Sequence, residues 1–277
     1  MDATVARKLY RALEPYHAMI YFIPEASQAY KAFGIGGRMG YFASRGAALG
    51  AVSAELIISA FYNFNPGLVR SAIPAAWQRA TPAQLVDARF GAADAALRRI
   101  LGERINSPEV TEAAQLAREA STACSAAGRI VYAAHTTLEW PTEPHMILWH
   151  AITLLREFRF GGHVAALLTD EVGPCEALVM HAATGEASRQ ALQTTRNWSD
   201  EEWEAATHNL RERGWLTAES TLTDEGKAHR DLVEQNTDRL ALAPWQHLGE
   251  VGCERLRELG RPLSRAILDA KAIPSGL

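Results

Sequence analysis

The chain has 277 residues, of which 48% are hydrophobic and 22% are charged, and its formal net charge at pH 7 is −4. These values are ordinary for a globular protein and argue against a nucleic-acid or membrane partner held by overall charge. No apolar run predicts a membrane-spanning helix or a signal peptide, and three widely spaced cysteines favour a reducing, cytoplasmic location.

Ala, Leu, Arg and Glu are abundant and alternating β-branched runs are scarce, so the fold is predicted to be mainly α. The helices expected in the first half cover residues 3–21, 24–32, 41–49, 51–62, 67–72, 75–78, 81–102 and 108–128. Thr81 followed by Pro82 is the pattern of an N-cap with proline at the first helical position. The helices expected in the second half cover residues 143–159, 163–171, 174–183, 186–196, 199–213, 226–242 and 245–272.

Residues 199–240 have the order of a winged helix. A predicted helix is followed by Arg-Glu-Arg-Gly-Trp-Leu at 211–216, a short polar hairpin, Leu-Thr-Asp-Glu-Gly at 222–226 and another helix. We expect the hairpin to form a small β wing. Residues 199–208 hold four acids and no Lys or Arg, whereas DNA-binding surfaces use those cations to contact phosphates. The scaffold therefore resembles a DNA-binding one, but its surface has the wrong charge.

A weak internal repeat supports a tandem arrangement. Shifting the chain by 121 residues places Trp77 on Trp198 and aligns the helices around them, although Ala-rich helices also align by chance. We interpret the chain as two winged-helix-like halves, residues 1–140 and 141–277, the second ending in a terminal helix. A cleft between the halves is the expected ligand site, because pockets favour domain junctions.

The string Phe-Tyr-Asn-Phe-Asn-Pro at residues 61–66 is a candidate binding motif. Asn and Pro suit a tight turn between helices, but two asparagines among three aromatic residues exceed what a turn requires. Tyr62, Asn63 and Asn65 are therefore predicted to contact a polar ligand. The alternative is a capped turn that buries its phenylalanines in the core.

A second candidate lies at residues 155–163. Arg156 and Arg159 share one helix face and are expected at a helix C-terminus, where cations are favoured. The Gly-Gly pair that follows is expected to reverse the chain and place His163 at the start of a new helix. There a partly positive helix end would keep the imidazole neutral, so His163 is predicted to be catalytic and the arginines to bind an anion. Alternatively, the arginines only compensate the helix dipole and the histidine caps.

His17 and Tyr21 are four residues apart and share a face of the first predicted helix. His17 is a second catalytic candidate and Tyr21 a ligand contact, with a core histidine bonded to a backbone carbonyl as the alternative. Trp140 and His145 bound a rigid loop that enters a helix, where they line a pocket wall or simply pack.

No cofactor or metal is predicted. Residues 34–40 approach a dinucleotide-binding loop, but Met39 stands where glycine is needed and no βαβ unit surrounds it. His145 and His150 are five residues apart, which turns them about 140° away from each other on a helix. A haem or metal held by residues distant in sequence remains the alternative.

Several strings together resemble a family of actinobacterial helix-turn-helix proteins. They lie at residues 17–25, 40–47, 61–66, 143–145, 162–167 and 198–203, and include Phe-Tyr-Asn-Phe-Asn-Pro and Gly-His-Val-Ala-Ala-Leu. The resemblance covers nearly the whole chain and implies a tandem winged-helix architecture more directly than it implies a function. Relatives commonly carry Arg-Gly-Asp-Gly-His where this chain has Arg-Phe-Gly-Gly-His at 159–163, so an acid that could orient the histidine is absent.

The principal hypothesis is a small-molecule-binding protein or acid–base enzyme on a winged-helix scaffold that has lost DNA binding, with its ligand between the halves. The alternative is a ligand-responsive winged-helix transcriptional regulator that contacts DNA through Arg189 and Arg196, or through Arg98, Arg99 and Arg104. A third interpretation is a structural protein that forms a homodimer through the amphipathic helix at 245–272.

Overall fold

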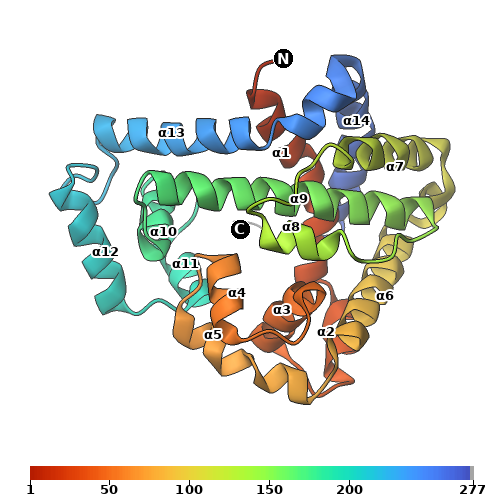
Figure 1. Ribbon diagram of the computed structural model, residues 1–277, viewed down its shortest axis with the longest axis horizontal. Coiled ribbons are helices and arrows are strands. Elements are labelled where there is room, and N and C mark those ends of the chain that lie inside the picture. The colour runs from red at the N-terminus through yellow and green to blue at the C-terminus, as the bar shows by residue number, and fades with distance from the viewer. Residues whose placement is uncertain (275–277) are drawn as a thin grey trace.

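The computed structural model describes residues 1–274 of the chain as an assembly of packed helices (Figure 1). The helices are α1 (Thr4–Ala18), α2 (Pro24–Lys31), α3 (Gly37–Gly46), α4 (Ala54–Phe61), α5 (Pro66–Ala72), α6 (Pro82–Leu101), α7 (Pro108–Ser121), α8 (Ile130–His135), α9 (Pro144–Thr169), α10 (Pro174–Ala182), α11 (Arg189–Arg196), α12 (Asp200–Glu212), α13 (Asp224–Leu240) and α14 (Ala243–Asp269). None of these helices is both long and apolar enough to span a membrane. The expectation of a mainly helical fold is confirmed.

Local signals set most helix boundaries where the sequence predicts them. Thr81 caps α6 in a reciprocal capping box with Gln84, and Pro82 occupies the first turn, as expected. Serine side chains cap α7, α11 and α12 in the same way by accepting from a backbone N–H of the first turn. The short helix α8 is not among the predicted elements.

Helix α9 is the axis of the molecule and runs across the centre of Figure 1, with α13 beside it. It packs against α1, α7, α8 and α13, and most of its 26 residues are buried. Because it is apolar on nearly every side, it has the composition of a fully buried helix rather than an amphipathic surface helix.

Two separate apolar clusters flank α9. The larger one joins α1 to α7 with the first half of α9 and with α14. The smaller one joins the end of α9 to α10, α11, α12 and Trp215, and we call the α10–α13 segment the helix-turn-helix module. The larger cluster draws on helices from both sides of residue 140, while the division into two halves at that residue stays a prediction.

The chain reversal predicted at Gly161 and Gly162 is wrong, because α9 continues through both residues. Both glycines serve close packing instead. A Cβ added at Gly161 would lie 2.7 Å from Cγ of Arg129, and one added at Gly162 would lie 3.0 Å from Cβ of Leu240. Arg129 precedes α8 and Leu240 ends α13, so the glycines let two neighbouring segments approach the α9 backbone.

The hairpin after α12 is smaller than the predicted wing. Within residues 1–274 there is no β-strand, and Leu216 and Leu222 form a single isolated antiparallel bridge. The side chain of Thr223 caps α13 and also donates to the carbonyl of Gly214, which closes the loop over a short distance. The loop therefore connects α12 to α13 without a two-stranded sheet.

Replacing Gly161 with alanine tests the packing role of this residue. We expect Gly161→Ala to lower the free energy of unfolding by about 1–3 kcal/mol, because Arg129 must move and it is held by the carbonyls of Phe158 and Leu240. The matched control is Gly91→Ala in α6, where an added Cβ meets nothing within 4 Å. The control should gain about 0.5–1 kcal/mol from helix propensity. Urea denaturation measures both, and a stabilised Gly161→Ala protein would contradict the packing role.

Candidate ligand cavities and buried charges

Two cavities adjoin each other beside α9. The polar cavity has a volume of about 580 Å³ and lies between α9 and the helix-turn-helix module, with residues such as Arg159, His163 and Met180 in its wall. The apolar cavity has a volume of about 780 Å³ and lies among α1, α2, α3 and α11. Both volumes fall within the range of small-molecule sites. The cavities share the wall residues Tyr10, Tyr41, Phe64, Arg156 and Arg196.

The structure brings most of the predicted site residues to these walls. The polar cavity is lined by Tyr62, Asn63, Arg156, Arg159 and His163. Tyr21 lines the apolar cavity. The other predicted site residues, which are His17, Asn65, Trp140 and His145, do not lie in either wall.

The turn between α4 and α5 ties the main core to the helix-turn-helix module. The hydroxyl of Tyr62 donates to the carbonyl of Val172 at 2.5 Å, and the indole of Trp198 donates to the carbonyl of Asn63 at 3.0 Å. Asn65 accepts from the N–H of Gly67, which caps α5, and its amide donates to Glu202. The geometry therefore supports a capped turn at Asn65, while Tyr62 and Asn63 also face the polar cavity.

His163 lies within α9 and not at the start of a helix, so the predicted influence of a helix N-terminus is absent. Burial is the main cause that lowers its pKa. The hydroxyl of Thr237 donates to the carbonyl of Val233, so its oxygen accepts from Nδ1–H of His163 at 3.0 Å. This fixes the neutral tautomer and leaves the Nε2 lone pair to accept a proton or a hydrogen bond at the cavity wall.

Arg156 and Arg159 also lie within α9, so the prediction that they compensate a helix C-terminus is wrong. Arg156 contacts Glu14 of α1 and Glu157 at 3.0 and 2.8 Å. Arg159 contacts Asp238 of α13 at 2.8 Å. Both arginines pair with carboxylates of the protein itself and join α9 to its neighbours.

Glu157 is the centre of a buried charge network. It is 1% exposed, and it accepts two hydrogen bonds from Arg45 of α3, at 3.1 and 2.8 Å. Burial opposes its ionisation, but Arg45 and Arg156 outweigh that effect and lower the pKa of Glu157 to about 2. The carboxylate is therefore charged at neutral pH, and it is satisfied on both sides.

Two other arginines, the buried Arg89 and the half-buried Arg196, have no carboxylate partner within the described residues. Arg196 lies over the ring of Phe64, and its Nε atom is buried without a hydrogen-bond partner. Arg89 is 3% exposed, lies over the ring of Tyr21, and leaves Nη1 buried without a partner. A charge that is removed from water without a counter-ion destabilises the fold, so an anion bound beside either guanidinium group would be stabilising.

Sequence reasoning did not single out Arg45, Arg89 or Glu157. For Arg89 a signal exists, because Leu85 and Ala92 lie on the same helical face four and three residues away and mark it as buried. An arginine on such a face needs a partner that a sequence does not identify.

His17 is fully buried, and its hydrogen bonds define its tautomer. The hydroxyl of Thr153 donates to the carbonyl of Trp149, so its oxygen accepts from Nδ1–H of His17 at 2.8 Å. Nε2 is then an acceptor, and the hydroxyl of Tyr21 donates to it at 3.0 Å. The partner of Nδ1 is thus a hydroxyl and not the expected backbone carbonyl, and only Tyr21 connects His17 to the apolar cavity.

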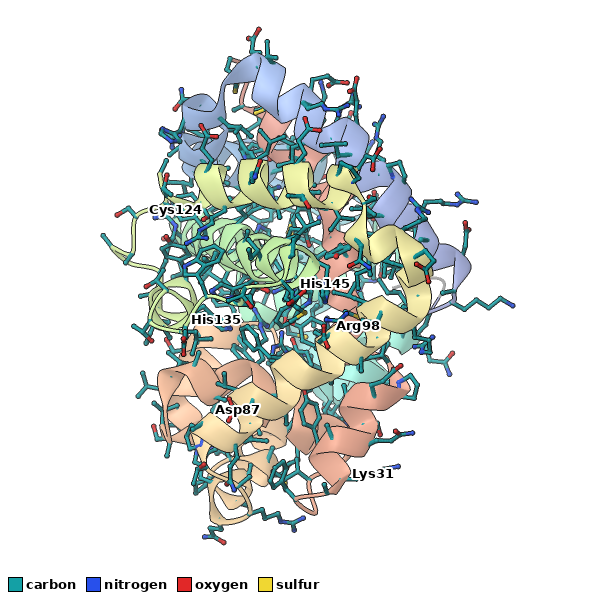
Figure 2. The ribbon with its side chains drawn as sticks, turned by 90° about the vertical axis from the view of Figure 1, so that its right-hand side faces the viewer. Lys31, Asp87, Arg98, Cys124, His135 and His145 are labelled. Atoms are coloured by element: carbon teal, nitrogen blue, oxygen red, sulfur yellow. The ribbon has the colours of Figure 1, made fainter. Side chains whose placement is uncertain are left out.

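His145 and Trp140 contact neighbouring side chains outside the two cavities, and their predicted role as ligand contacts stays a prediction. His145 contacts Asp94 at 2.5 Å and lies beside Arg98, which binds the same carboxylate (Figure 2). Trp140 contacts the ring of His150 edge to face at a centroid distance of 4.7 Å. Within residues 1–274 no group of three or more His, Cys, Asp or Glu side chains is placed to hold a metal ion.

Three buried histidines predict a loss of stability in mild acid. Burial lowers the pKa of His135 and His150 to about 4 and that of His17 well below its usual value. Below about pH 6.5 these histidines take up protons in the unfolded chain but stay neutral in the folded protein. The free energy of unfolding therefore decreases as the pH is lowered, by up to about 1.4 kcal/mol per pH unit for each histidine.

His150→Leu isolates one of these contributions, because both ring nitrogens of His150 lack hydrogen-bond partners. The variant should lose stability less steeply than the native protein between pH 6.5 and 4.5, by about one proton per molecule. Urea denaturation across this range measures the dependence of the free energy of unfolding on pH. The difference in that free energy between the two proteins at pH 8 measures the packing contribution alone. Equal slopes would show that His150 is not held neutral.

The comparisons with known proteins give one match. A family model described as "Helix-turn-helix family" matches residues 6–274. No curated protein and no solved structure matches the chain.

Proposed function

The chain belongs to this helix-turn-helix family. We propose that it is a small-molecule-binding protein whose scaffold does not bind duplex DNA. The ligand occupies the polar cavity, between the main core and the helix-turn-helix module. The observation that carries the proposal is the cavity itself, of about 580 Å³, with Arg196 in its wall and without a carboxylate partner among the described residues.

The charge on α12 argues against duplex DNA as the ligand. This helix directly precedes the bridged loop, which is the position of the recognition helix in a winged-helix protein. Its exposed acids include Asp200 and Glu204, with side chains that are 81% and 56% exposed, and both contact the same partner, Arg189. A phosphate backbone approaching this face meets carboxylates first.

Acid–base chemistry is compatible with the same cavity. His163 is held neutral by Thr237 and keeps Nε2 available at the wall, which is the state required of a general base. In an enzymatic form of the proposal, His163 exchanges a proton with the bound molecule and Arg159 contributes positive charge beside it.

A ligand-responsive regulator is the second candidate, and the family match favours it. The order of α10 to α13 is that of the helices in a winged helix, with a single β-bridge in place of the wing, and the polar cavity lies against α10, α11 and α13. A ligand there would shift the module relative to α9. We also propose that such a regulator consists of two tandem halves and forms a homodimer.

Chromatography on nonspecific duplex DNA tests the proposed loss of DNA binding. We expect the native protein to pass unretained at about 50 mM salt, because phosphate contacts need exposed cations. The control is a triple variant of α12, Asp200→Lys, Glu201→Lys and Glu204→Lys, which should gain salt-sensitive retention. Strong retention of the native protein with a steep salt dependence would favour the regulator.

Filling the polar cavity tests whether it holds the ligand. Val164→Trp places a large side chain in the cavity wall, whereas Leu168→Trp lies one turn further along α9 with its side chain in solvent. Native mass spectrometry of the purified proteins should detect a bound small molecule with the native chain and with Leu168→Trp. Val164→Trp should lack it. Equal occupancy in all three proteins would place the ligand elsewhere.

A further inference from the structure

The chemistry of the shared wall identifies the class of ligand, provided that the protein binds a small molecule as proposed above. We infer that this ligand is an amphipathic monoanion: its acidic group pairs with Arg196 and its apolar body occupies the apolar cavity. The inference extends the site from the polar cavity through the shared wall into the second cavity.

Arg196 stands at the junction of the two cavities. It is the last residue of α11, and it contributes to both walls. Its guanidinium lies 4.7 Å from the ring centre of Phe64, which supports the cation on one side. The buried Nε atom has no hydrogen-bond partner, and desolvation lowers the pKa of Arg196, which marks an unfavourable position for an isolated cation.

The charges around the junction do not balance. Arg45, Arg156 and Arg196 bring three positive charges, whereas Glu157 brings one negative charge and Glu14, whose pKa burial raises, brings at most one more. Both carboxylates contact Arg45 or Arg156, and neither contacts Arg196. With both carboxylates ionised one positive charge is left over, and a single negative charge on the ligand then neutralises the cluster.

Two acids of the polar cavity wall, Glu186 and Glu234, are engaged by other cations. Glu234 contacts both Arg7 and Arg159 at 3.5 Å. Glu186 contacts Arg230 at 3.5 Å, and Asp231 is exposed. These groups therefore do not supply the counter-ion that Arg196 lacks.

Tyr41 provides a second donor beside Arg196. Arg45 donates to the hydroxyl oxygen of Tyr41 at 3.0 Å, so the hydroxyl hydrogen of Tyr41 remains to donate elsewhere. Tyr41 lines both cavities, as Arg196 does. A carboxylate between them would accept from a guanidinium and a phenol, which is a charge-assisted arrangement.

The apolar cavity suits a hydrocarbon body. Its volume is about 780 Å³, and its wall includes Phe22, Ile23, Tyr30, Phe42 and Leu68. Burial of each CH2 group of a ligand there is favourable, because it removes apolar surface from water. A multiply charged ligand such as a nucleotide fits poorly, because among the described residues Arg196 is the one cation of the shared wall without a carboxylate partner, and most of the wall of the apolar cavity is hydrophobic.

Calorimetry with a matched pair of probes tests the inference: decanoate, which carries the charge, and decanamide, which has the same chain without it. The native protein should bind decanoate about 10- to 100-fold more tightly than decanamide. Arg196→Gln should remove this preference and leave decanamide binding unchanged, and Arg196→Lys should restore part of it. The matched control is Arg189→Gln, at the opposite end of α11 and exposed, which should keep the native preference.

A second measurement separates a missing counter-ion from a structural role. Without ligand, Arg196→Gln should unfold at a temperature about 2–4 °C higher than the native protein, because it removes a half-buried cation that has no carboxylate partner among the described residues. A lower unfolding temperature would mean that the protein itself satisfies Arg196 and would overturn the inference.

The outcomes also separate this inference from the proposed function. Equal affinities for decanoate and decanamide overturn the anionic ligand but leave a small-molecule cavity in place. Absence of binding by either probe overturns the amphipathic ligand, and the proposed function then stands or falls with the mass-spectrometric detection of a bound molecule.

Discussion

The ion pairs of Glu157 are the interaction on which the arrangement of the cavities depends. This carboxylate lies on α9 and holds Arg45 of α3 and the adjacent Arg156, which in turn contacts Glu14 of α1. Three helices from distant parts of the chain are thereby fixed beside the two cavities. Because the network is buried, loss of one partner leaves an uncompensated charge, and the helices cannot shift independently.

Because α9 is continuous, it connects this charge network to the helix-turn-helix module. A single rigid helix carries Arg156 and Arg159 at the main core and His163 at the helix-turn-helix module. Its two adjacent glycines admit the side chain of Arg129 and the end of α13 at close range. The unbroken α9 therefore both allows this dense packing and sets the distance between the charged groups and the module.

The distribution of charge is opposite to that of a DNA-binding protein, which carries its cations on the exposed recognition surface. Acids cover the exposed face of α12, while several arginines, such as Arg45, Arg89 and Arg196, lie in the interior or at the cavity junction. Exposed cations would attract a polyanion, whereas cations beside a cavity suit the small anion that we propose as the ligand. The helix-turn-helix order and the buried cations together favour recognition of a ligand inside the molecule.

The sequence by itself determined most of the helices, the capping of α6 by Thr81 and the acidic surface of α12, because each depends on residues a few positions apart. It also singled out five residues of the polar cavity wall. Only the tertiary structure decided that α9 is unbroken at Gly161 and that Arg196 has no carboxylate partner within residues 1–274. A glycine pair suits either a turn or a close contact, and the compensation of a charge depends on partners such as Arg45 and Glu157, which are 112 positions apart in the chain.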